Sequence, residues 1–199
     1  MTKNKVAWVA WVEESDATGD VAEAYAGVAG PDGTVENLYK GMSLTPKVIG
    51  PADEHYLALL HNSASPLAPW LAELVATYVS ILCGSRYAAI NHGENFEHYF
   101  CDRKKSSAVL AMLREGQISK AGLAVDACAA LEFTRKISCS PDKMSKEDID
   151  TLRQSGFCDV GISYIAQIAA SFAYWARITN ALGIQPGDKI GLSERPLET

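Results

Sequence analysis

The stretch Glu73-Leu-Val-Ala-Thr-Tyr-Val-Ser80-Ile-Leu-Cys83-Gly-Ser85-Arg-Tyr87-Ala88-Ala-Ile-Asn-His92 decides the fold of this 199-residue chain. Its apolar residues recur at helical spacing up to Leu82, and Gly84 then provides a left-handed cap that ends the helix. A second helix is expected to begin at Ser85. Ser85, Ala88 and His92 are three and four residues apart, so they share one face of it. We expect Glu73 to lie on the preceding helix, near the middle of an antiparallel pair.

This stretch resembles the signature of the alkylhydroperoxidase D family, part of the carboxymuconolactone decarboxylase superfamily. In the redox members, a glutamate precedes a Cys-x-x-Cys pair, and a histidine follows four residues after it. Here Glu73 and His92 stand nineteen residues apart, as in that signature, and Ser80 and Tyr87 are in place. The two cysteine positions are occupied by Ser85 and Ala88.

Further segments resemble the peroxidase-related branch of the same family. They lie in residues 33–46, 152–157 and 181–186, so the resemblance covers most of the chain. The branch usually has Asn-Arg before the Leu-Gly of the last segment, whereas this chain has Ala176-Arg177.

The resemblance implies a redox mechanism that this chain lacks the groups to complete. In the redox relatives the second cysteine attacks a peroxide, the first resolves the sulfenic acid, and glutamate and histidine relay the proton. Carried over, Glu73 would be the base and His92 the relay, with Ala88 at the attacking and Ser85 at the resolving position. Ala88 has no nucleophilic atom, and the Ser85 hydroxyl stays protonated without strong activation. We therefore predict no thiol-dependent peroxidase activity.

What remains is a pair suited to acid–base chemistry. Glu73, His92 and Ser85 are the candidate catalytic residues, and Tyr87, Ala88 and Arg177 are the candidate binding residues. We expect a peroxidase-related protein, an oxidoreductase by resemblance, with Glu/His acid–base chemistry on a small molecule. The superfamily includes decarboxylases of cyclic lactone acids without the cysteine pair. The alternative is a non-catalytic protein of the same fold that binds a small ligand or serves assembly.

Each candidate residue also has a structural interpretation. Ser85 follows a glycine and opens a helix, so it fits an N-cap. Glu73 on an apolar helix fits a buried carboxylate paired with His92 or Arg177. Cys83 lies nine residues before His92, on the opposite side of a continuous helix, and fits a small buried hydrophobe. Only an unusual turn would bring its sulfur near Glu73.

The remaining histidines give no metal or cofactor pattern. Glu94 and His98 share a helix face, but the chain contains no Glu-x-x-His and the better interpretation is a solvated face. His55 and His61 have no spaced partner, and we expect both at the surface. Since no nucleotide, phosphate or haem motif occurs either, we expect no metal and no cofactor.

Composition narrows the class of protein. The net charge of −6 argues against nucleic acid and against anionic membrane surfaces, and no apolar run is long enough to span a bilayer. The five cysteines are an odd number and form no Cys-x-x-Cys, so a reducing cytoplasm is the expected compartment. The N-terminus lacks the features of a signal peptide.

The pattern along the chain predicts one all-α domain over residues 1–199, an alkylhydroperoxidase D-like helical bundle. No sustained strict alternation of apolar and polar residues indicates strands. An arm over 1–18, apolar from Val6 to Val12, and a tail over 187–199 are expected to be irregular. We expect a homo-oligomer, with the arm a candidate for packing on a neighbour. Helices are predicted over residues 46–63, 67–82, 85–101, 104–115, 119–137, 145–155 and 158–182.

Overall fold

The computed structural model describes residues 6–187, and within that range every regular element is a helix, with no β-strand. The predicted tail falls almost wholly outside the described residues. The α-helices are α1 Gly19–Val28, α2 Asn37–Gly41, α3 Pro46–Leu60, α4 Pro69–Leu82, α5 Arg86–Phe100, α6 Arg103–Arg114, α7 Val125–Cys139, α8 Lys146–Gln154 and α9 Asp159–Leu182. Three 3₁₀ turns are η1 Glu14–Asp16, η2 Ile118–Lys120 and η3 Pro141–Lys143.

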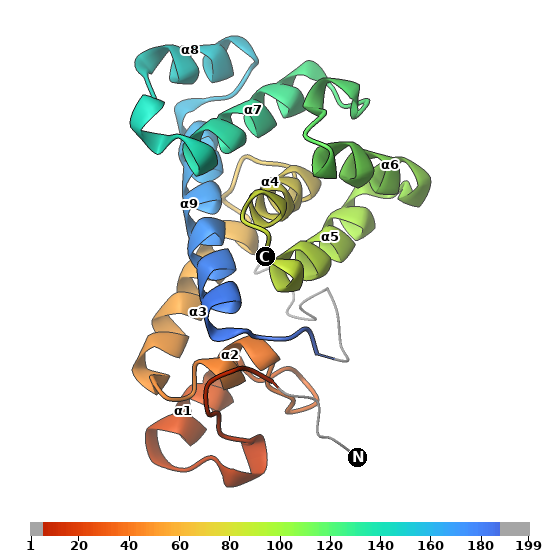
Figure 1. The fold of residues 1–199 in the computed structure, drawn as a ribbon. Helices are drawn as coiled ribbons and strands as arrows, with labels where there is room; N and C mark the ends of the chain where they lie inside the picture. The colour runs from red at the N-terminus through yellow and green to blue at the C-terminus, as the bar shows by residue number, and fades with distance from the viewer. Residues whose placement is uncertain (1–5, 188–199) are drawn as a thin grey trace.

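Helix α4 lies at the centre of the bundle. It packs against α5, α7 and α9, which surround it in Figure 1. All ten residues from Leu71 to Ser80 are buried, so this helix has no solvated stripe. A helix that is apolar around most of its circumference is stable only when other elements cover every side. The segment that carries Glu73 is thus the core of the fold.

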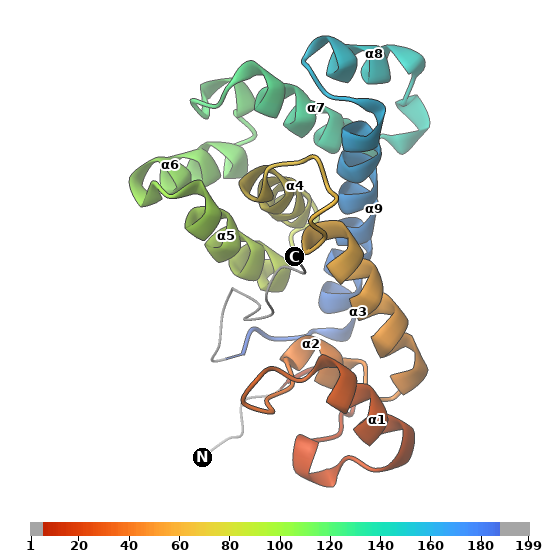
Figure 2. The same cartoon turned by 180° about the vertical axis from the view of Figure 1, so that it is seen from behind.

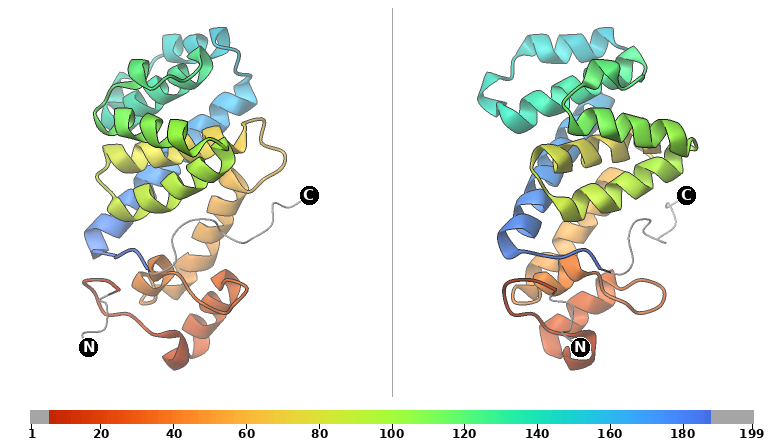
Figure 3. Two further views of the ribbon diagram at one scale, coloured as in Figure 1. Left: turned by 90° about the vertical axis from the view of Figure 1, so that its right-hand side faces the viewer. Right: turned by 45° about the vertical axis from the view of Figure 1, so that its right-hand side comes forward.

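The other end of the molecule is a smaller layer built from α1, α2 and the start of α3. Figure 2 shows α3 leading from this layer along α9, and Figure 3 shows α7 and α8 at the opposite end. A separate apolar cluster joins the layer to α9 through Ile49 and Trp175. The N-terminal arm contacts the end of α9, where Trp8 donates its backbone N–H to the carbonyl of Leu182.

The described part of the N-terminal arm packs partly on its own chain. Val6 and Ala7 were candidates for packing on a neighbouring chain, yet both are buried against their own chain, in a cluster with Tyr87 and Ile184. Trp8, next in the described part of the arm, is 66% exposed. The apolar pattern of the arm is therefore satisfied mostly within one chain.

Local signals explain most helix boundaries. Proline opens both α3 and α4, since its missing N–H has no intrahelical partner in a first turn. Gly84 adopts φ +65° and ends α4 as expected, and a capping box between Ser145 and Asp148 opens α8. Gly122, at φ +69°, separates η2 from α7, so the helix predicted from residue 119 begins only at Val125.

Candidate functional site

Glu73 and His92 meet in the interior, across the α4–α5 pair. The Nδ1 atom of His92 lies 2.7 Å from Oε2 of Glu73, and their side chains are only 13% and 3% exposed. An ionised carboxylate can only accept hydrogen bonds, so Nδ1 carries the proton and donates it to Glu73. The other ring nitrogen, Nε2, is the one that does not face Glu73.

A third residue completes the carboxylate's surroundings. Asn95, one helical turn after His92, donates from Nδ2 to Oε1 of Glu73 at 3.2 Å. Each oxygen of Glu73 therefore has its own donor from α5. Buried carboxylates require such partners because desolvation of the bare charge is costly. The sequence analysis did not single out Asn95, although its three-residue spacing from His92 places it on the same helix face.

Aromatic rings frame the imidazole of His92. The Phe172 ring, from α9, stands edge-on to it with centroids 4.4 Å apart, and the Tyr56 ring, from α3, does the same at 6.0 Å. The four elements α3, α4, α5 and α9 thus all contribute to this position. Apolar walls of this kind keep water from competing for the histidine–carboxylate hydrogen bond.

Tyr56 links this site to a second histidine. Its hydroxyl lies 2.8 Å from Nε2 of His61, and His61 is 7% exposed. The expectation of a surface position is wrong for His61, because this residue caps α3 and turns inward onto the helix it ends. His55 is exposed, as are Glu94 and His98, so those residues lie on solvated faces.

Ser85 is fully engaged as a structural residue. It is 1% exposed and caps α5, with Oγ accepting from the backbone N–H of Ala88 at 3.3 Å. The same oxygen lies 2.8 Å from Oγ1 of Thr179, which itself donates to the Trp175 carbonyl within α9. With the Thr179 proton committed to that carbonyl, Ser85 is the donor of the pair, and its hydroxyl spans α5 and α9.

The candidate binding residues are only partly brought together. Ala88 and Tyr87 are buried at the start of α5, and the Tyr87 hydroxyl donates to Oε2 of Glu36 at 3.0 Å. Burial, followed by the Glu36 charge, raises the pKa of Tyr87 well above its usual range. Arg177 is exposed and donates to the Ala173 carbonyl of its own helix. The carboxylate of Glu73 is thus paired with His92 and not with Arg177.

Cys83 belongs to the turn rather than to the site. It is the C-cap of α4, partly buried against the core between α4, α7 and α9, and its carbonyl accepts from the Asn180 amide at 3.0 Å. Burial raises the pKa of its thiol. A protonated thiol is a poor nucleophile at neutral pH.

Solved structures with the same arrangement of helices identify the fold of this chain. An alkylhydroperoxidase AhpD-core, peroxidase-related protein from Ralstonia eutropha JMP134 aligns over 94% of this chain and 95% of its own, with a TM-score of 0.79 and 22% identity. A peroxidase-related protein from Silicibacter sp. TM1040 aligns over the same shares of the two chains, with a TM-score of 0.79 and 20% identity. The chain has the AhpD fold. Neither protein-family models nor curated proteins match it.

The AhpD fold also carries other chemistry. The debrominase Bmp8, as a cysteine-to-alanine variant in complex with 2,3,4-tribromopyrrole, aligns over 94% of this chain and 94% of its own, with a TM-score of 0.69 and 20% identity. The expectation of an all-α, AhpD-like bundle is therefore confirmed. At this level of identity the likeness establishes the arrangement of helices, while the chemistry depends on the residues in each site.

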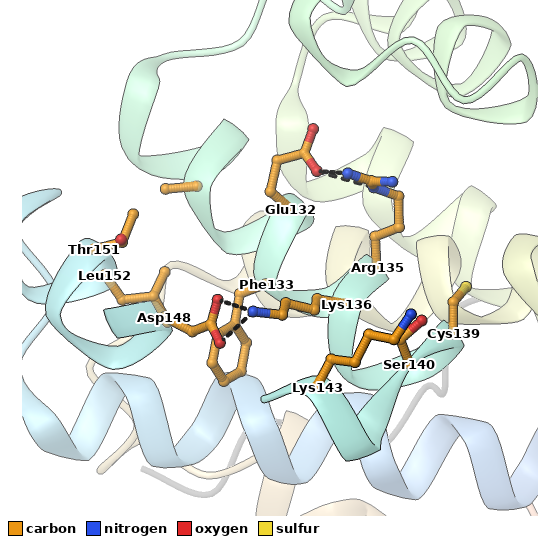
Figure 4. A pocket seen from close by; sticks show the side chains of 11 residues that line it. Glu132, Phe133, Arg135, Lys136, Cys139, Ser140, Lys143, Asp148, Thr151 and Leu152 are labelled. Atoms are coloured by element: carbon orange, nitrogen blue, oxygen red, sulfur yellow. Dashed lines mark hydrogen bonds and ion pairs between the residues drawn. The ribbon is translucent and has the colours of Figure 1, made fainter. Parts of the chain in front are cut away.

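A hollow of about 400 Å³ in this AhpD-fold chain lies away from Glu73 and His92 (Figure 4). It is formed by α7, η3 and α8, with the ion pair of Lys136 and Asp148 across it at 2.6 Å. Within residues 6–187, no group of three or more histidine, cysteine or carboxylate side chains is arranged to hold a metal ion. No helix in that range is long and apolar enough to cross a bilayer.

Proposed function

We propose that this protein performs acid–base chemistry on a small molecule through the Glu73–His92 pair, without a thiol peroxidase cycle. The observation that carries the proposal is the 2.7 Å hydrogen bond between two nearly buried side chains. Fixing Nδ1–H on the carboxylate orients the ring and leaves Nε2 to take a proton from a bound molecule. Glu73 then stabilises the imidazolium that forms.

The solved structures with the same fold indicate which kinds of reaction to consider. Two are peroxidase-related proteins and one is a debrominase, so the AhpD fold serves small-molecule chemistry of more than one kind. In this chain the positions equivalent to the redox pair are a helix cap and an alanine. We therefore assign no covalent thiol step, and the reaction left to Glu73 and His92 is proton abstraction or donation, as in decarboxylation of an acidic lactone.

The tautomer of His92 provides the direct test. In Glu73→Gln, the Asn95 amide keeps donating to the remaining carbonyl oxygen, so the new amide group faces Nδ1 and must donate to it. His92 is then expected to switch to the Nε2–H tautomer and lose its base. We expect imidazole ¹⁵N NMR at mildly alkaline pH to report Nδ1–H in the natural protein and Nε2–H in the variant.

Glu94→Gln is the matched control, since it removes an exposed carboxylate from the same helix. This control is expected to keep the Nδ1–H tautomer and every other His92 signal. An Nε2–H tautomer in the unaltered protein would contradict the proposed role of Glu73. So would a Glu73→Gln variant that leaves the tautomer unchanged.

The activity is tested on a panel of substrates. It comprises cyclic lactone acids, an organic hydroperoxide with a dihydrolipoyl reductant, and 2,3,4-tribromopyrrole. We expect turnover of a lactone acid that Glu73→Gln abolishes, and no thiol-dependent reduction of the hydroperoxide. The second candidate is a non-catalytic role, favoured by the rings of Tyr56 and Phe172 that close on His92. Absence of any turnover, with His92 signals unmoved by every compound, would decide for that role.

A further inference from the structure

A second location on the molecule has the features of a ligand site and is independent of Glu73 and His92. The hollow over α7 has a volume of about 400 Å³, within the range of small-molecule pockets. Its wall on one side is α7, and on the other the turn η3 and helix α8, as Figure 4 shows. Apolar side chains of Ala129, Phe133 and Leu152 contribute to the lining.

The charges around this hollow differ in sign from those of the whole chain. Arg135, Lys136 and Lys143 supply three positive charges, and Glu132 and Asp148 supply two negative ones, so the local balance is +1. The chain as a whole carries −6. An anion that reaches this hollow therefore meets a lining with a small net positive charge.

The cations keep hydrogen-bond donors that the internal ion pairs do not use. Lys136 gives two N–H groups to the two oxygens of Asp148, at 2.7 and 2.6 Å, and an ammonium has a third. Arg135 uses Nε and Nη2 on Glu132, and a guanidinium has further N–H groups beyond these. Lys143 forms no ion pair with another residue in the described part of the chain.

We infer that this hollow binds a small organic anion, a carboxylate with a short apolar or aromatic body. The carboxylate would be held by Lys143 together with the spare donor of Lys136. The hydroxyl of Ser140 lines the same space and can donate a further hydrogen bond, whereas the Thr151 hydroxyl donates to the Glu147 carbonyl. The apolar body would cover Phe133 and Leu152. Inorganic anions lack that body and are expected to bind more weakly.

A cysteine in the lining makes the site measurable. Cys139 is exposed and lines the hollow, whereas Cys101 and Cys158 are exposed elsewhere. Benzoate is the probe, benzyl alcohol its neutral counterpart, and iodoacetamide an uncharged alkylating reagent read out by peptide mass spectrometry. At benzoate about three times its Kd, mass action predicts alkylation of Cys139 slowed about fourfold, since a covered thiol does not react. Cys101 and Cys158 are expected to react at unchanged rates.

Two variants separate binding from general charge effects. Lys143→Gln should remove the protection of Cys139, and Lys120→Gln, which alters an exposed lysine outside the hollow, should leave it intact. Amide NMR shifts confined to residues 129–152 on benzoate addition would support the site independently of the thiol. The inference is overturned if benzyl alcohol protects equally, if Lys143→Gln protects as well as the natural protein, or if benzoate produces neither protection nor shifts.

Discussion

The buried carboxylate of Glu73 needs hydrogen-bond donors to offset its loss of hydration, and a histidine and an asparagine supply them. Glu73 receives one hydrogen bond from His92 and one from Asn95, both from α5. An arginine partner would hold the carboxylate as a fixed ion pair, whereas a histidine can gain or lose its proton near neutral pH. This choice of partner supports the proposed proton transfer at Glu73 and His92.

The state of Cys83 leads to a prediction on thiol reactivity. Burial raises the pKa of this thiol, so little thiolate exists at neutral pH. We expect iodoacetamide to modify exposed Cys101 well before Cys83, and no thiol-dependent hydroperoxide reduction. Peptide mass spectrometry on a time course measures the first, and peroxide consumption with a dithiol the second. Turnover that disappears in Cys83→Ser would identify a displaced nucleophile and contradict this prediction.

Introducing a cysteine pair tests whether these positions have the geometry of the redox signature that the sequence resembles. Ser85→Cys with Ala88→Cys places two thiols one turn apart at the first turn of α5, where unpaired N–H groups favour a thiolate. Both sites are buried, and Ser85 also loses its hydrogen bonds to Ala88 and Thr179, so we expect a cost of about 2 kcal/mol in unfolding free energy.

The double variant is expected to form an intramolecular disulfide and to gain hydroperoxide reduction. Adding Glu73→Gln should remove most of that gain, because the proton acceptor is lost. Thiol titration after mild oxidation measures the disulfide, and urea unfolding measures the cost. A folded double variant that forms no disulfide would show that the spacing of these positions matches the redox signature by coincidence.

At the scale of elements, most helices were predictable because their signals are local. Prolines, glycines and apolar periodicity mark α3 to α9 within three residues of their observed bounds, except for the start of α7, which was predicted six residues too early. Helices α1 and α2 were missed; α2 has only five residues, and neither helix has a side-chain N-cap hydrogen bond. Their stability comes from packing on α3 and α9, which local sequence does not reveal.

The residues of the candidate site also fall into those that local spacing predicts and those that only tertiary packing brings in. The meeting of Glu73 and His92 was foreseen, because helix spacing and the resemblance both place them together. Tyr56 and Thr179 were not, since they come from helices distant in sequence and only tertiary packing brings them near α5. Arg177 was expected at the site because α9 packs there. Neighbouring residues point in different directions around a helix, and Arg177 faces solvent whereas Ala176 is buried.

The capping box of α8 gives a prediction on pH. The Lys136 ammonium, followed by hydrogen bonds from Ser145, holds the pKa of Asp148 below its ordinary value of 3.8. Asp148 has a lower pKa in the folded state than in the unfolded state, so its carboxylate stabilises the fold at pH values above the unfolded-state pKa. This stabilisation is lost as the pH falls through the folded-state pKa.

We expect Asp148→Asn to lower the free energy of unfolding by about 1 kcal/mol near neutral pH, because the site is partly exposed and the ion pair is screened. The difference from the natural protein should shrink by about pH 3. Urea unfolding at both pH values measures it, with Asp142→Asn, an exposed neighbour, as the control. An undiminished difference at low pH would assign the effect to packing rather than to charge.

At the scale of the whole molecule, several large apolar side chains remain outside the four clusters that form the core. Leu44 and Val48 are 61% and 45% exposed near the start of α3, and Val125, Val160 and Tyr174 are exposed on α7 and α9. Scattered exposure is normal for a monomer, but Leu44 and Val48 are four residues apart at one end of α3. Val6 and Ala7 are buried in their own chain while Trp8 of the arm is 66% exposed, so this end of α3 is a candidate for contact between copies beside the arm.

We therefore predict a homo-oligomer whose contact includes Leu44 and Val48. Multi-angle light scattering at micromolar concentration should give a multiple of 21.4 kDa, and Val48→Glu should lower it by placing a charge in a desolvated contact. Glu54→Gln, a change on an exposed residue of the same helix, is the matched control and should leave the mass unchanged. A mass near 21.4 kDa for the unaltered chain would contradict the assembly. An oligomer that survives Val48→Glu would instead assign the contact to another face.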